Sequence, residues 1–123
     1  MNKKIRVLVI DDEAIIRMSC KRALPSDEYD VDIVDSGEAG IALFDNHPYD
    51  IVLVDLKMPG MDGLQVLETI KKKTSRQKVI SMTGYHTAEL IVESLSSGAS
   101  HFIEKPFAPD LLHDRIREVL QSS

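Results

Sequence analysis

Short apolar runs recur along the chain, and most of them end where a chemically active side chain begins. The runs cover residues 5–10, 31–34, 51–54, 79–82 and 101–103, and valine, isoleucine and leucine dominate most of them. Runs of this length and composition are typical of strands that are buried on both faces of a parallel sheet. The pattern therefore predicts five strands.

Segments with helical signals alternate with these strands. The predicted helices cover about residues 13–24, 37–46 and 64–73, a stretch between Thr87 and Gly98, and a last helix that begins at Pro109. Ser36 and Thr87 suit helix N-caps, and proline suits the first helical position. Five strands alternating with five helices predict an α/β fold, a three-layer sandwich around a parallel sheet. Because no linker or repeat interrupts the pattern, we expect residues 1–123 to form a single domain.

The composition is ordinary for a compact globular protein. The chain has 123 residues, of which 43% are hydrophobic and 28% charged, and its formal net charge is −5. A negative net charge argues against general binding to nucleic acid or to acidic membranes. The single cysteine, Cys20, excludes an internal disulfide and fits a reducing compartment. No segment resembles a signal peptide or a membrane span, so we expect a cytoplasmic protein without membrane contact.

Acidic residues follow two of the predicted strands. Asp11 and Asp12 come directly after the first strand, and Asp55 follows the third strand. Because the carboxyl ends of parallel strands meet at one sheet edge, we expect these three carboxylates to lie together. One aspartate after a strand is most often a helix cap, but three neighbouring carboxylates repel one another unless a cation lies among them. Oxygen ligands of this kind favour Mg²⁺, with Mn²⁺ as an alternative, over a softer metal.

A carboxylate beside Mg²⁺ can also attack phosphorus and form an aspartyl phosphate. That chemistry requires neutralisation of the charge on the phosphoryl oxygens. Thr83 and Lys105, at the ends of the fourth and fifth strands, offer a hydroxyl and an ammonium for this purpose. Each alone would be interpreted as a helix cap or a solvated side chain, but together with the aspartates they favour a phosphoryl-transfer site.

These motifs resemble the receiver domains of two-component response regulators. The resemblance covers nearly the whole chain and rests on VLVIDDE at 7–13, LVDLKMPGMDG at 53–63, SMTG at 81–84 and EKPF at 104–107. It implies a flavodoxin-like fold with strand order 2-1-3-4-5. It also implies a cis peptide bond between Lys105 and Pro106, since bonds that precede proline tolerate the cis form.

The resemblance implies roles for the acidic residues. Asp55 would accept a phosphoryl group from a phosphohistidine on a sensor histidine kinase or a phosphotransfer protein. Asp12, Asp55 and the backbone carbonyl of Lys57 would bind Mg²⁺ directly, and Asp11 would act largely through water. The chain would catalyse its own phosphorylation and dephosphorylation and would not turn over a separate substrate.

Thr83 and Lys105 would each contact a phosphoryl oxygen, and the resemblance links the first contact to a switch. When the Thr83 hydroxyl moves inward, it leaves space for an aromatic ring, which here is Phe102, three residues before the lysine. Because Phe102 lacks the hydroxyl of tyrosine, no hydrogen bond can hold its outward rotamer. The face that a downstream output contacts, and through which two copies could dimerise, would comprise the fourth helix, fifth strand and fifth helix, roughly residues 87–119.

Two residues at the rim of the site are expected to control how long the phosphorylated state lasts. Lys57 and Tyr85 lie two positions after Asp55 and Thr83, respectively. By the resemblance, such side chains govern the access of water to the acyl phosphate, so a long lysine and a bulky tyrosine predict slow self-hydrolysis. The alternative is that both simply cover apolar surface.

The first helix carries a candidate partner surface. Ile15, Met18 and Arg22 lie off its main apolar face, near the end of the helix that faces the site. By the resemblance, the helices of a kinase or phosphotransfer protein would contact them, with Ile15 as an anchor. A slightly wide core-facing stripe explains the same residues equally well.

Three other functions fit parts of the pattern. A Mg²⁺-dependent phosphohydrolase usually has a second acid two residues after its nucleophile, where this chain has Lys57. A flavin-binding protein would need a phosphate-cradling loop after the first strand, where residues 11–13 are acidic. A receiver that docks without being phosphorylated would not require the intact set of site residues.

Overall fold

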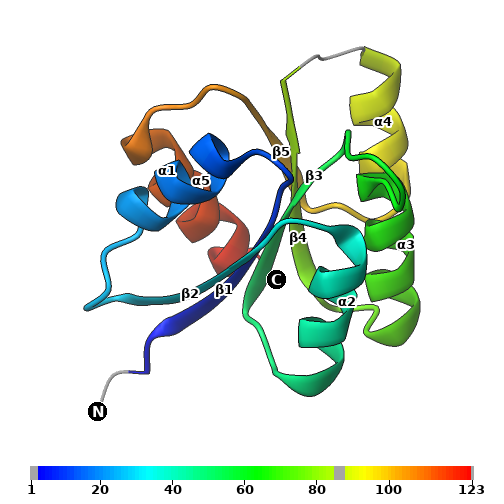
Figure 1. Ribbon diagram of the computed structural model, residues 1–123. Helices are drawn as coiled ribbons and strands as arrows, with labels where there is room; N and C mark the ends of the chain where they lie inside the picture. Colours follow the sequence, from blue (N-terminus) through cyan, green and yellow to red (C-terminus); the bar gives the residue numbers. More distant parts are fainter. Residues whose placement is uncertain (1–2, 85–87, 123) are drawn as a thin grey trace.

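A five-stranded parallel sheet lies at the centre of the computed structural model, which describes residues 3–84 and 88–122 (Figure 1). The strand order is β2-β1-β3-β4-β5, as predicted. The strands are β1 Ile5–Ile10, β2 Tyr29–Val34, β3 Ile51–Asp55, β4 Lys78–Thr83 and β5 His101–Glu104. In the ladder, Asp55 pairs with Met82 and Thr83 pairs with Glu104, so the ends of these strands are level with one another.

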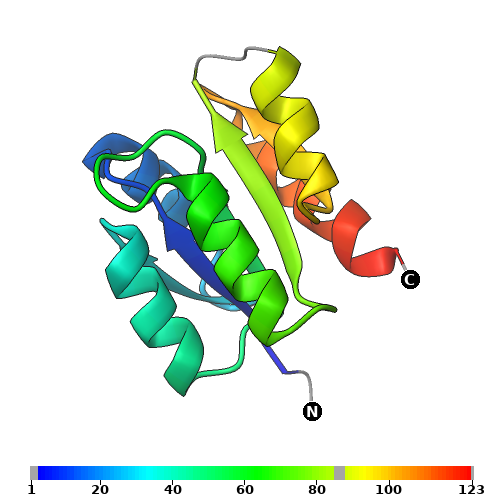
Figure 2. The same cartoon turned by 90° about the vertical axis from the view of Figure 1, so that its right-hand side faces the viewer.

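Five helices connect the strands and cover both faces of the sheet. They are α1 Ala14–Ala23, α2 Gly37–Asn46, α3 Gly63–Lys73, α4 Ala88–Ser96 and α5 Pro109–Gln121. Figures 1 and 2 show α1 and α5 on one face and α2, α3 and α4 on the other. The predicted three-layer α/β architecture is therefore confirmed. No helix in the described ranges is long and apolar enough to cross a membrane.

Side chains that alternate along the strands build a core on each face of the sheet. Val7 and Val9 pack toward α1 and α5, whereas Leu8 and Ile10 pack toward α2 and α3. All four are fully buried, as expected for a central strand covered by helices on both sides. The sheet thus brings the residues at the carboxyl ends of its strands to one edge of the molecule.

The observed boundaries differ from the predicted ones by one or two residues. β3 and β5 each extend one residue past their apolar runs, because Asp55 and Glu104 still pair with neighbouring strands. β4 is two residues longer than its run, since both Lys78 and Thr83 pair, and β2 begins two residues early at Tyr29. Helix α3 begins at Gly63, one residue early, where the Asp62 side chain accepts from the Gln65 amide in a capping box. The predicted cap Thr87 lies outside the described residues.

Other local expectations are met. Ser36 caps α2 by accepting a hydrogen bond from the Ala39 amide, and Pro109 is the first residue of α5. The peptide bond between Lys105 and Pro106 is cis, as the resemblance implied. Glu13 occupies the N-cap position of α1, but its side chain forms no capping hydrogen bond. That side chain is therefore available for a contact elsewhere.

Candidate functional site

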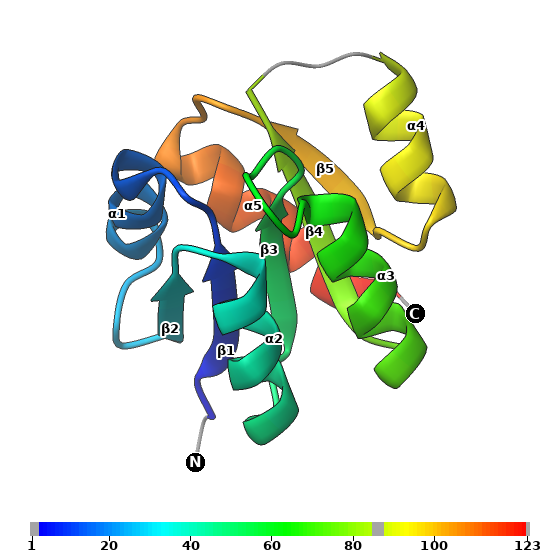
Figure 3. The same ribbon diagram turned by 45° about the vertical axis from the view of Figure 1, so that its right-hand side comes forward.

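The carboxyl ends of four neighbouring strands converge on one edge of the sheet. Figure 3 shows the loops that follow β1, β3 and β5 side by side at the upper end of the molecule. Asp11 lies directly after β1, Asp55 and Thr83 are the last residues of β3 and β4, and Lys105 follows β5. The residues that the sequence singled out as chemically active therefore lie at one edge of the sheet.

Four carboxylates form the acidic part of this location. Asp11, Asp12, Glu13 and Asp55 each offer a ligand oxygen, and these atoms all lie within 4.8 Å of one another. Asp11 and Asp55 are buried, whereas Asp12 and Glu13 are exposed. The cluster thus extends from the core to the surface.

Lys105 brings an ammonium group into the acidic cluster. Its Nζ lies 2.7 Å from Oε1 of Glu13, 3.1 Å from Oδ2 of Asp11 and 3.3 Å from Oδ2 of Asp55. The lysine side chain is only 6% exposed. Because the ion pairs with Asp11 and Asp55 are almost dry, each charge strongly affects the protonation of the others.

The two buried carboxyls resist ionisation. Burial, together with the negative charge of Asp11, raises the pKa of Asp55 from its ordinary value of 3.8 to about 7, against the opposing effects of the Lys57 amide and Lys105. Burial also raises the pKa of Asp11, although the Glu13 amide and Lys105 oppose this. Burial alone would lower the pKa of Lys105, but the hydrogen bond to Glu13 and the charges of Asp11 and Asp55 raise it above its ordinary range.

Backbone amides orient the two buried aspartates. The Glu13 amide donates to Oδ1 of Asp11 over 2.8 Å, and the Lys57 amide donates to Oδ1 of Asp55 over 3.1 Å. In both cases the donor lies two residues after the aspartate, as in an Asx-turn. The remaining oxygen of each carboxylate, Oδ2, is the one that contacts Lys105.

Gly63 lets the start of α3 approach the end of β3. A Cβ atom at this position would lie 2.1 Å from the backbone oxygen of Asp55 and 2.5 Å from the Cα of Leu56. Both obstacles are backbone atoms, which cannot swing aside like a side chain. The glycine therefore allows the start of α3 to lie directly against the end of β3.

The site opens into a cleft of about 500 Å³. Its lining comprises Asp12, Glu13, Ile16, Asp55, Lys57, Gly84, Lys105 and Pro106. Carboxylates, an ammonium and a small apolar wall thus border a space that is large enough for a phosphoryl group. Lys57 is exposed at the rim, while Tyr85, the second predicted rim residue, lies outside the described residues.

Thr83 and Phe102 lie on neighbouring strands and face the same side of the sheet. Phe102 pairs with Ser81, two residues before Thr83, and residues two apart on a strand share a face. Thr83 is 1% exposed, whereas Phe102 is only partly buried. The ring therefore lies between the interior and the surface, next to the strand that carries the hydroxyl.

The candidate partner residues lie outside the cleft lining. Ile15 is 78% exposed and Met18 is 47% exposed, and Arg22 is also exposed on the same helix. These exposures argue against the alternative in which Ile15 and Met18 belong to a wide core-facing stripe. Ile16, the neighbour of Ile15, is buried and lines the cleft instead.

Glu13 is the site residue that the sequence reasoning missed. It forms the shortest of the three contacts with Lys105, although 92 positions separate the two residues. A signal was present, since Glu13 continues the acidic run of Asp11 and Asp12. Its partner could not be deduced from that run, because an exposed glutamate before a helix ordinarily interacts with solvent or with the helix dipole.

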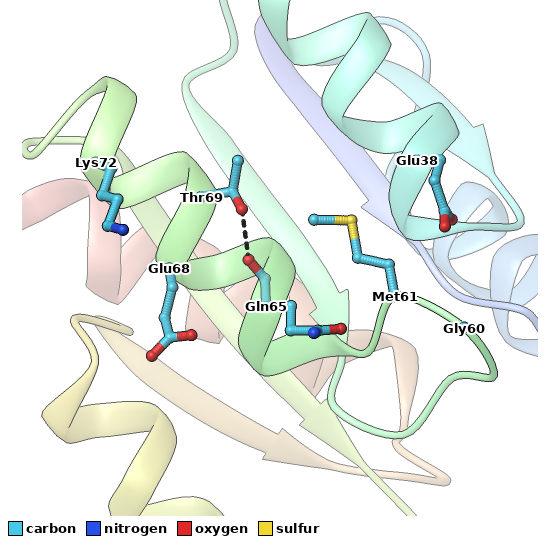
Figure 4. A pocket seen from close by; sticks show the side chains of 7 residues that line it. All are labelled: Glu38, Gly60, Met61, Gln65, Glu68, Thr69 and Lys72. Atoms are coloured by element: carbon cyan, nitrogen blue, oxygen red, sulfur yellow. Dashed lines mark hydrogen bonds between the residues drawn. The ribbon is translucent and has the colours of Figure 1, made fainter.

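A second hollow of about 560 Å³ lies between α2 and α3, away from Lys105. Its lining comprises Glu38, Gly60, Met61, Gln65, Glu68, Thr69 and Lys72. Figure 4 shows Glu38 and Glu68 on different helices, with Met61 and Gln65 between them. The charged groups do not converge on one point there, which distinguishes this hollow from the cleft.

A parallel sheet of order β2-β1-β3-β4-β5 with helices on both faces defines the flavodoxin-like α/β class. Within that class, the model of the response regulator receiver domain matches residues 7–117. The chain therefore belongs to the family of response regulator receiver domains, which act in phosphorelay signal transduction.

Individual relatives agree with this assignment. The cell cycle response regulator CtrA of Brucella ovis is 35% identical over 119 residues, which are 97% of this chain and 51% of the relative. The chain thus spans about half the length of such relatives. A receiver domain protein (CheY-like) from Methanospirillum hungatei JF-1 is 36% identical with a TM-score of 0.90, covering 96% of this chain and 94% of that one. A receiver domain from Clostridium thermocellum is 30% identical with a TM-score of 0.87, covering 94% of each chain.

Family membership carries several general properties. Receiver domains are phosphorylated on an aspartate and bind Mg²⁺ through acidic residues. They interact with histidine kinases or phosphotransfer proteins and with output domains. The acidic cluster of Asp11, Asp12, Glu13 and Asp55 supplies the type of ligand that such a site requires.

Proposed function

We propose that residues 1–123 act as one receiver domain and that Asp55 is the phosphoacceptor. The observation that carries this proposal is the position of the Asp55 carboxylate, which is buried at the base of the cleft with Lys105 3.3 Å away. A carboxylate that acts as a nucleophile needs one side open to its substrate and a cation on the other side that offsets its negative charge. Among the acidic residues of the cluster, Asp55 combines burial with a place in the cleft lining.

The donor set fits a hard divalent cation. Four carboxylates lie close together, and Lys105 supplies one positive charge among them. Asp12, Asp55 and the backbone carbonyl of Lys57 would hold Mg²⁺ or Mn²⁺ directly, and Asp11 would act largely through water. The bound ion would neutralise negative charge on a phosphoryl oxygen.

The chain's own residues would carry out the transfer. An oxygen of Asp55 forms the new bond to phosphorus while the bond from phosphorus to the donor nitrogen breaks and the electron pair returns to the imidazole. Lys105 and the hydroxyl of Thr83 stabilise charge on the phosphoryl oxygens. A water molecule later attacks phosphorus, the bond from phosphorus to the Asp55 oxygen breaks, and inorganic phosphate leaves, which restores the Asp55 carboxylate. The chain thus catalyses both steps on itself, without turnover of a separate substrate.

Phosphorylation would be communicated to the face formed by α4, β5 and α5. Thr83 moves toward the phosphoryl group, and Phe102 takes an inward position. Val92 and Leu95 of α4 and Leu111 of α5 are exposed apolar side chains on these helices, with exposed fractions of 60%, 40% and 40%. They are suited to contact an output domain or a second copy of the chain.

The kinase or phosphotransfer protein would dock on α1. Ile15 and Met18 offer exposed apolar surface, and Arg22 offers a positive charge on the same helix. Ile15→Asp should slow transfer from a phosphorylated partner several-fold without changing phosphorylation by acetyl phosphate, which needs no docking surface. Equal slowing with both donors would contradict a docking role.

Intact-mass spectrometry tests the phosphoacceptor assignment. After incubation with acetyl phosphate and Mg²⁺, we expect one added phosphoryl group on the wild-type chain and none on Asp55→Asn. The method suits this chain because it contains no tryptophan for a fluorescence assay. An adduct that persists in Asp55→Asn would assign the acceptor elsewhere, and no adduct on the wild type would favour a docking module that is not phosphorylated.

The same time course measures the lifetime of the adduct. If Lys57 at the rim restricts water, Lys57→Asn should lose its phosphoryl group faster than the wild type. A variant that keeps the group as long as the wild type, or longer, would contradict the role of Lys57. Tyr85→Ala tests the second rim position in the same way.

A further inference from the structure

Glu13 holds the ammonium of Lys105 in a contact for which the phosphoryl transfer described above has no use. Its Oε1 lies 2.7 Å from Nζ of Lys105, closer than the oxygens of Asp11 or Asp55. Glu13 is the N-cap residue of α1, yet its side chain does not cap the helix. The carboxylate instead reaches across the cleft toward the residue after β5.

The lysine ammonium has as many donors as it has carboxylate neighbours. An ammonium carries three N–H groups, and three carboxylates surround this one. A phosphoryl group that approaches Asp55 brings further acceptor oxygens before the bond to Asp55 forms, so one of the existing contacts must be released. Asp11 has no exposed surface and the Asp55 side chain is 3% exposed, whereas Glu13 is 59% exposed and can turn to solvent.

We propose that Glu13 is a positioning residue that competes with the incoming phosphoryl group for Lys105 and thereby slows phosphorylation of Asp55. The inference rests on the proposed function of Asp55 and adds a regulatory role to the same site. In the resting chain, Glu13 partly neutralises the ammonium that the phosphoryl oxygens require. Exposed ion pairs are weak, so we expect release of this contact to accelerate phosphorylation by only about two- to fivefold.

Three substitutions distinguish the contact between Glu13 and Lys105 from a general effect of the negative charge of Glu13. Glu13→Gln keeps the size of the side chain but removes its charge. Glu13→Asp keeps the charge but is one methylene shorter, so its carboxylate is drawn back from Lys105 and the contact is weakened. Glu68→Gln is the matched control, because Glu68 is an exposed carboxylate on α3 that lines the other hollow.

The rate of phosphorylation by acetyl phosphate with Mg²⁺ is followed by intact mass. In this reaction the bond from phosphorus to the acetyl oxygen breaks, acetate leaves with the electron pair, and the bond to Asp55 forms. We expect both Glu13 variants to react about two- to fivefold faster than the wild type and Glu68→Gln to react at the wild-type rate. If Glu13→Asp reacts like the wild type, the glutamate acts by general repulsion of the donor, and the proposal is overturned.

A second measurement tests the contact without metal or donor. In the ¹⁵N-labelled chain, the ammonium signal of Lys105 should shift in both Glu13 variants and stay in place in Glu68→Gln. An unchanged Lys105 signal, or Glu13 variants that react no faster, would overturn the role of Glu13 while leaving Asp55 as the acceptor. A wild-type chain that takes up no phosphoryl group would overturn the proposed function as well.

Discussion

At the scale of single residues, the charge of Asp55 governs how stability depends on pH. Its pKa is raised from 3.8 to about 7, so the folded chain keeps a proton that the unfolded chain loses near pH 4. Between these values the folded state binds more protons than the unfolded state. In the absence of Mg²⁺, the free energy of unfolding should therefore fall as pH rises from about 4 to 7.

Denaturant unfolding of the wild type and Asp55→Asn over this pH range measures the effect. Asn cannot ionise, so the variant should have a shallower slope and should be more stable by about 1–3 kcal/mol near pH 7.5. Protonation of Asp11 contributes in the same direction and remains in both chains. Parallel slopes for the two chains would indicate that Asp55 is ionised throughout the range.

At the scale of elements, the junction of β3 and α3 depends on Gly63. The Cβ of alanine there would meet the Asp55 backbone oxygen at 2.1 Å, so the helix or the strand end would have to move. We expect Gly63→Ala to destabilise the fold by about 1–3 kcal/mol and to slow phosphorylation, because the acceptor moves with the strand. Gly84→Ala is the control for stability, since its Cβ would meet only the Lys105 side chain at 3.7 Å.

Thermal unfolding of both alanine variants gives the comparison. A Gly63→Ala chain as stable as Gly84→Ala would mean that the junction can relax and that the close approach is not required. Gly63 also shows what the local sequence can predict about a helix and what it cannot. The helix start was predicted within one residue, but the reason for a glycine there is a contact with the preceding strand, which composition and periodicity do not reveal.

At the scale of the whole molecule, the acidic edge makes stability depend on divalent cations. An ion that binds only the folded chain stabilises it by about 1.4 kcal/mol when its concentration is ten times Kd. We therefore expect MgCl₂ to raise the melting temperature by roughly 3–8 °C at that concentration. Asp12→Asn should lose most of the increase, since Asp12 is an exposed member of the cluster whose replacement leaves the core intact.

Differential scanning calorimetry with NaCl at matched ionic strength separates binding from screening. Screening alone would also relieve repulsion among the four carboxylates. An equal increase with NaCl, or an equal increase in Asp12→Asn, would argue against a specific cation site.

The sequence by itself determined the elements and the kinds of chemistry at their ends. Hydrophobic periodicity, helix caps and prolines act over a few residues, so the five strands and five helices could be predicted from the chain alone. The positions of Asp11, Asp55, Thr83 and Lys105 at strand ends followed from these elements and from the match to a family. The tertiary structure decided what depends on distance and burial. The contact of Glu13 with Lys105 forms because strands far apart in the sequence end side by side at one edge of the sheet. The pKa of Asp55 is raised because its carboxyl is buried there, where neighbouring charges interact with little screening by water.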